Sequence, residues 1–170
     1  MGFPAAPVGV RGNEMDYCKI AKQWFEKGNI ESDPFNQFIC FWISFNALYN
    51  RSEGSSEKQR IEKFLKDHYR EEFDSILEED DVTFFYTPIK NLHPRGRSIS
   101  DTSRYVEKLE KAKKPAKRII NLFLCIYQAR CNLFHGDKVP REYRDQEIAA
   151  HSANILKNYL EAFLKCKTYF

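Results

Sequence analysis

The chain has 170 residues, 42% of them hydrophobic and 15% aromatic, which suits one domain with a substantial core and argues against intrinsic disorder. It carries 27 Lys and Arg against 24 Asp and Glu, a formal charge of +3, which does not by itself identify a nucleic-acid-binding protein. The five cysteines are odd in number and lack metal-ligand spacing, and no apolar run approaches the ~20 residues that span a bilayer. We therefore expect a cytoplasmic protein with reduced thiols, no membrane association, no metal and no cofactor.

The N-terminal residues 1–12 contain Gly and Pro and predict a disordered leader, so that a single domain would cover 13–170. The spacing of apolar residues and stop signals predicts the helices in chain order. They are expected at about 13–28, 34–50, 55–77, 102–113, 115–135 and 140–166. These segments predict an all-α fold, namely an up-down bundle of four to five main helices.

Short signals mark the ends of several of these helices. Gly28 is typical of a helix stop, and Asp33 suits an N-cap position with Pro34 as the first helical residue. Pro115 opens a later helix in the same way. Gly136 suits the position just after the end of that helix, where a left-handed backbone is favourable.

The stretch 78–102 is the hardest to assign. Residues 82–86, with the sequence VTFFY, have a strand-like composition, but a lone strand would have no partner elsewhere in the chain. A short helical turn is therefore an equal alternative. The Pro and Gly that follow, at 93–98, predict a loop.

A charged residue lies on the apolar face of the helix expected over 115–135. The apolar members of this face are Ile119, Phe123, Ile126, Leu133 and Phe134. At about 100° per residue, Arg130 falls near the middle of the same face. A guanidinium there is unfavourable unless it is paired or functional, because Arg does not lose its charge. Pairing with a carboxylate and a role in a functional site are both open interpretations.

Three further polar residues are candidates for a site around Arg130. Asn46 lies among the aromatic residues of the helix expected over 34–50, and it is predicted to hydrogen-bond Arg130 if the two apolar faces pack together. Asn132 and His135 are three residues apart and share a helix face. Arg130 and His135 are about 140° apart on a regular helix. They converge only if the helix end frees His135 or if a symmetric dimer brings two copies together.

Two segments carry a resemblance to a known family. The sequence RCNLFHG at 130–136, at a helix end, resembles the signature of the HEPN (higher eukaryotes and prokaryotes nucleotide-binding) superfamily. The sequence WISFNALY at 42–49 is similar to the corresponding helix of Apea-like HEPN proteins. The resemblance covers roughly 13–166. It implies a helical bundle that is usually dimeric and, in active members, a metal-independent endoribonuclease.

The resemblance also implies roles for individual residues. Arg130 and His135 would be the catalytic pair, and Asn132 would position them. RNA supplies its own nucleophile, the 2′-OH, and an imidazole that titrates near pH ~6.5 can act as base or acid. An Arg can hold the scissile phosphate and stabilise its developing charge. The implied products carry 2′,3′-cyclic phosphate and 5′-OH ends. The expected biological role of such an enzyme is that of a toxin or defence effector.

Partners and alternatives follow from the same reasoning. RNA and a second copy of the chain are the expected partners, with an antitoxin or a nucleotidyltransferase as a further one. The residues expected to contact RNA are Lys113, Lys114, Lys117, Arg95, Arg97 and Lys138. One alternative is an inactive HEPN dimer that binds RNA, a nucleotide or a protein. Another is a helical interaction module in which Arg130 forms a buried ion pair.

Overall fold

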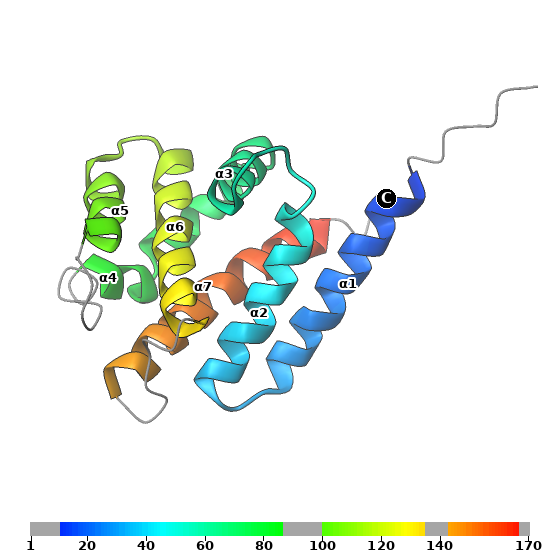
Figure 1. Cartoon of the computed structure of the whole chain (residues 1–170), viewed down its shortest axis with the longest axis horizontal. Coiled ribbons are helices and arrows are strands. Elements are labelled where there is room, and N and C mark those ends of the chain that lie inside the picture. The colour runs from blue at the N-terminus through cyan, green and yellow to red at the C-terminus, as the bar shows by residue number, and fades with distance from the viewer. Residues whose placement is uncertain (1–10, 87–99, 135–142, 167–170) are drawn as a thin grey trace, which may run out of the picture.

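In the computed structural model, residues 11–86, 100–134 and 143–166 are described, and all regular elements in these ranges are helices (Figure 1). They are α1 (Arg11–Ile30), α2 (Pro34–Tyr49), α3 (Glu57–Asp67), the 3₁₀ helix η1 (Glu71–Glu78), α4 (Asp80–Tyr86), α5 (Ser100–Lys111), α6 (Pro115–Phe134) and α7 (Tyr143–Cys166). The predicted all-α class is confirmed for this part of the chain. No helix within it is both long enough and apolar enough to cross a bilayer.

Two antiparallel helix pairs lie side by side, α1 with α2 and α5 with α6 (Figure 1). The C-terminal helix α7 passes behind α6 and packs along α2. The short helix α3 packs against α6, and η1 connects it to α4. Through this arrangement α2, α3 and α6 surround the region where Arg130 lies.

The aromatic side chain of Phe45 is the centre of the core. It is fully buried, and its ring lies within 6 Å of five other aromatic rings, measured between centroids. These rings belong to Trp42, Tyr49, Phe64, Phe123 and Tyr159. Since they come from α2, α3, α6 and α7, one side chain joins four helices.

Local signals set the starts of α2 and α3. The carboxylate of Asp33 accepts a hydrogen bond from the backbone N–H of Asn36 at 3.0 Å, which confirms the predicted N-cap of α2. The hydroxyl of Ser56 does the same for Gln59 at 3.3 Å at the start of α3. Such bonds satisfy amides that have no partner within the first helical turn.

The predicted end of the first helix is wrong, because Gly28 lies inside α1 and the helix continues to Ile30. α1 also begins at Arg11, within the range expected for the leader, whose residues 1–10 lie outside the described part of the chain. Gly28 is buried, and a Cβ atom added to it would meet Cε1 of Phe41 at 2.5 Å. Glycine is present here because α1 and α2 approach closely, and helix termination is not its role.

Replacement of Gly28 by Ala is expected to lower the free energy of unfolding by about 1–2 kcal/mol. Overpacking against the buried ring of Phe41 costs about 1–3 kcal/mol, and the better helix propensity of Ala returns up to about 1 kcal/mol. Urea denaturation followed by circular dichroism measures the change. The control is Asn29→Ala on the exposed side of the same helix, and equal stabilities of the two variants would contradict the explanation.

Two other boundaries differ from the prediction. The helix expected over 55–77 ends at Asp67, and the chain continues as η1 after a break. In the ambiguous stretch, residues 80–86 form α4, so the strand interpretation is wrong and the helical alternative is correct. Val82 and Phe85 are fully buried, which explains their apolar character without a strand. The loop expected at 93–98 lies outside the described residues.

Candidate functional site

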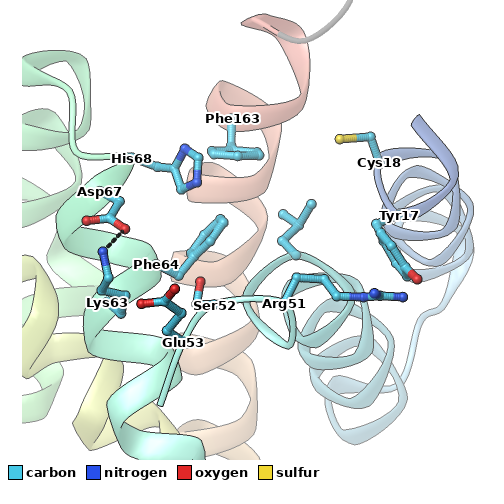
Figure 2. Close-up of a pocket in the computed structure, with 11 residues that line it drawn as sticks. Tyr17, Cys18, Arg51, Ser52, Glu53, Lys63, Phe64, Asp67, His68 and Phe163 are labelled. Atoms are coloured by element: carbon cyan, nitrogen blue, oxygen red, sulfur yellow. Dashed lines mark hydrogen bonds and ion pairs between the residues drawn. The ribbon is translucent and has the colours of Figure 1, made fainter. Parts of the chain in front are cut away.

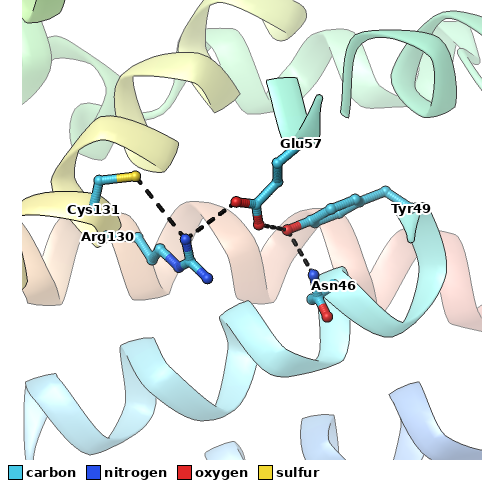
Figure 3. A network of polar contacts seen from close by, with 5 residues as sticks. All are labelled: Asn46, Tyr49, Glu57, Arg130 and Cys131. Carbon is cyan, nitrogen blue, oxygen red and sulfur yellow. Dashed lines mark hydrogen bonds and ion pairs between the residues drawn. The ribbon is translucent and has the colours of Figure 1, made fainter. Parts of the chain in front are cut away.

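Arg130 is placed near the C-terminal end of α6, facing α2 and α3 (Figure 3). Its guanidinium carbon lies 5.6 Å from the centre of the Trp42 ring, which is itself buried. About a quarter of the Arg130 side chain, 26%, remains exposed. The residue therefore lies on the packing face of α6, as the sequence pattern predicted, but at the margin of the core.

A carboxylate from α3 neutralises this guanidinium. Nη1 of Arg130 donates to Oε2 of Glu57 at 3.2 Å, and the Glu57 side chain is 21% exposed (Figure 3). Pairing of Arg130 with a carboxylate, one of the two open interpretations, is thus confirmed. Because both partners retain contact with solvent, the pair is weaker than a fully buried one and is partly screened.

The second oxygen of Glu57 extends the network to α2. Oε1 accepts a hydrogen bond from the Tyr49 hydroxyl at 2.5 Å, and that hydroxyl accepts one from Nδ2 of Asn46 at 2.7 Å (Figure 3). Burial raises the pKa of Tyr49, and its hydrogen bond to Glu57 raises it further. Tyr49 is therefore a neutral donor at physiological pH, and it orients the carboxylate that faces Arg130.

Asn46 belongs to the same network as Arg130, but it is connected through two other residues. The amide group of Asn46 donates to Tyr49, whose hydroxyl donates to Glu57, which in turn accepts from Arg130. The predicted hydrogen bond between Asn46 and Arg130 is therefore indirect. The side chain of Glu57 lies between α2 and α6, and together with the Tyr49 hydroxyl it connects the two residues. Asn46 supports the orientation of the carboxylate.

Sequence reasoning missed Glu57. Its position directly after the N-cap Ser56 is already explained by the favourable interaction of an acid with a helix N-terminus. Tyr49 is one of the aromatic residues of the segment 34–50, and its buried ring is explained by core packing without any polar role. The sequence indicated only that an arginine on a packing face needs a carboxylate partner. It did not indicate which of the many Asp and Glu residues would be that partner.

The other two residues of the predicted catalytic set are not joined to this network by a described contact. The side-chain oxygen of Asn132 accepts a hydrogen bond from Gln128, one turn earlier on α6, at 2.9 Å. His135 lies outside the described residues, as does Gly136. The convergence of Arg130 and His135 therefore stays a prediction.

An aromatic and basic margin borders Arg130 on the side of α5. The ammonium group of Lys58 lies 5.9 Å from the ring centre of Tyr127 and 5.0 Å from that of Tyr105. The Tyr127 ring is 6.3 Å from Trp42. Burial raises the pKa of Tyr127, with a smaller contribution from its hydrogen bond to Cys131. Trp42 and Tyr105 are buried and Tyr127 is only partly exposed, so Tyr127 is the one ring of the three with a face near solvent.

The predicted RNA-contacting lysines lie at the other end of α6. Lys113, Lys114 and Lys117 are exposed where α5 leads into α6. At 1.5 Å per residue along the helix, Lys117 and Arg130 are about 20 Å apart. Arg95, Arg97 and Lys138 lie outside the described ranges. The structure thus separates the lysines from the Arg130 network and does not gather them around it.

Comparison with family models, with curated proteins and with solved structures gives no match. No group of three or more His, Cys, Asp and Glu among the described residues is placed to hold a metal ion. Cys18, Cys40, Cys125 and Cys131 are free thiols.

Proposed function

We propose that this protein is a metal-independent endoribonuclease of the HEPN type. The observation that supports the proposal is the placement of Arg130, a permanent cation held near a helix end by Glu57 with part of its surface open to solvent. Such a guanidinium can bind an RNA phosphate through two parallel hydrogen bonds. The ammonium group of Lys58 offers charge, and the partly exposed ring of Tyr127 a stacking surface, for the adjacent nucleotide.

The proposed reaction uses the 2′-OH of RNA as nucleophile. His135 takes the proton of the 2′-OH as its oxygen attacks phosphorus, or an imidazolium in that position protonates the departing 5′-oxygen. A second group or water supplies the complementary proton transfer. Arg130 stabilises the charge that builds on the phosphoryl oxygens, and the products carry 2′,3′-cyclic phosphate and 5′-OH ends.

A homodimer is part of the proposal because Arg130 and His135 do not converge on one straight helix. A two-fold axis near the end of α6 would bring both pairs to a shared RNA. The lysines at the start of α6 would then lie at the two outer ends of the dimer. They would contact RNA phosphates away from the cleavage site. These contacts would raise the affinity for RNA but would not determine which phosphodiester bond is cleaved.

A second candidate function is favoured by the ion pair itself. Because Glu57 already neutralises Arg130, the pair can serve the fold alone, and the protein would then be an inactive HEPN dimer that binds RNA, a nucleotide or a protein. An antitoxin or nucleotidyltransferase is a partner under either function.

Incubation of the purified protein with diverse RNAs, with and without chelator, followed by end-group analysis, tests the two functions. The first predicts cleavage that resists chelation, gives cyclic phosphate ends, and is lost in His135→Ala. The combined variant Lys113→Gln, Lys114→Gln and Lys117→Gln should weaken RNA binding and make it less dependent on salt. Binding without any cleavage by the wild type would instead support the second function.

A further inference from the structure

A cavity of about 340 Å³ lies away from the Arg130 network, among α1, the end of α2, α3 and the last turns of α7 (Figure 2). None of its lining residues belongs to that network. The cavity is open to solvent on one side, and its volume is near the lower end of the range for binding sites, roughly 300–1,000 Å³. It can therefore accept a group of about the size of one aromatic side chain.

The floor of the cavity is apolar and rigid, because Leu48, Phe64 and Phe163 belong to the core. The exposed ring of His68 stands at one side, with its centre 4.7 Å from that of Phe64 and 5.8 Å from that of Phe163. On the other side, the partly exposed Cys18 directs its thiol across the cavity (Figure 2). The space between His68 and Cys18 suits a flat apolar ring.

The four charged residues of the lining, two basic and two acidic, balance one another. Lys63 and Asp67 form an ion pair at 2.5 Å across one turn of α3. The pKa of Lys63 is raised by this hydrogen bond and, to a smaller extent, by the charge of Glu53. Arg51 turns away to Tyr17 and stacks on its ring, with its guanidinium carbon 3.7 Å from the ring centre (Figure 2). A charged occupant is therefore not required, and the apolar floor decides what fits.

The chain leaves α7 next to this cavity. α7 ends at Cys166, three residues after Phe163, which is about 4.5 Å along the helix axis. The residues that follow, 167–170, have the sequence KTYF and lie outside the described part of the chain. Four residues can span at most about 13–14 Å, which is enough to return a side chain from the end of α7 to Phe163. Two of these four residues are aromatic.

We propose that residues 167–170 occupy this cavity, with the ring of Tyr169 or Phe170 between His68 and Cys18. The ring covers apolar surface that otherwise faces water. Because only two or three residues separate it from α7, its effective concentration at the cavity is high and the loop that must close is short. The docked segment joins the end of α7 to α1 and α3.

The N-terminal segment 1–10 is a poorer occupant of the cavity. Its only aromatic residue, Phe3, precedes the start of α1 at Arg11 by eight residues. α1 then continues for about two turns, roughly 10 Å, before it reaches Cys18. A much longer loop would have to close to bring the Phe3 ring to the same place, and its closure costs more entropy.

Alkylation of Cys18 by iodoacetamide reports whether the cavity is occupied, because this thiol lines it. The full chain is used with Cys131→Ser and Cys166→Ser, and Cys40 and Cys125 are buried. Mass spectrometry of the digested protein then gives the rate of alkylation at Cys18 alone. No RNA is involved, so the result does not depend on the proposed nuclease function.

The combined variant Tyr169→Ser and Phe170→Ser is expected to raise the rate of Cys18 alkylation at least about tenfold, because the thiol then lies open to solvent. The matched control is Thr168→Ala, which changes the same segment but retains both rings and should leave the rate unchanged. Phe3→Ser should also leave it unchanged.

Three results would overturn the proposal. Equal rates of alkylation with and without the two rings would show that residues 167–170 do not cover Cys18. A higher rate in Phe3→Ser, without an effect of the ring variant, would assign the cavity to the N-terminal segment. Protection that disappears when the protein is diluted would assign it to a second copy of the chain.

Discussion

Arg130→Ala is expected to lower the rate of RNA cleavage by at least about 100-fold. This is the effect of removing one charge-stabilising donor from an active site, about 2.7–4 kcal/mol of transition-state stabilisation. The folded state should lose much less, about 1 kcal/mol or less, because the ion pair with Glu57 is partly exposed. Cleavage rates under single-turnover conditions, together with urea denaturation, separate the two effects.

Two further variants refine this expectation. Arg130→Lys retains the charge but not the planar fork that holds a phosphate and a carboxylate together, so its cleavage rate should stay close to that of Arg130→Ala. Glu57→Gln retains the shape of the network and loses its charge, which should reduce cleavage by a smaller factor, about tenfold. Full cleavage by Arg130→Ala would show that the guanidinium serves the fold alone.

Phe45→Ala is expected to lower the free energy of unfolding by about 3–5 kcal/mol, the largest effect on stability that we predict. The ring is fully buried and contacts aromatic rings from four helices. Its removal leaves a cavity that this framework of large rings cannot collapse to fill. Urea denaturation measures the loss, and a fall in the midpoint without a change in slope would indicate that the folded state remains compact.

The matched control is Ile20→Ala on α1, where the side chain is 41% exposed. It removes apolar atoms of a similar kind from the surface, and its expected cost is at most about 1 kcal/mol. A similar loss of stability in both variants would contradict the central position assigned to Phe45. It would indicate that α1 contributes as much to the core as α2.

The candidate site was predictable only in part. The unusual position of Arg130 follows from helical periodicity, and so does its proximity to α2, because apolar faces pack together. The carboxylate that meets it could not be chosen, since Glu57 is 73 residues away in sequence and resembles any acid in a first helical turn. Without Glu57, the sequence predicted a direct hydrogen bond between Asn46 and Arg130. In the structure, Tyr49 and Glu57 lie between these two residues and connect them.

The sequence by itself determined the all-α class, most helix positions and the N-cap of α2, since these depend on contacts within three or four residues. Other features were decided only by how the helices pack, with α1 on α2, α3 on α6, and α7 behind them. This packing placed Gly28 inside a helix, paired Arg130 with Glu57, and formed the cavity beside Arg51. Each of these features joins residues far apart in the chain, and their partners are selected only when helices meet in three dimensions.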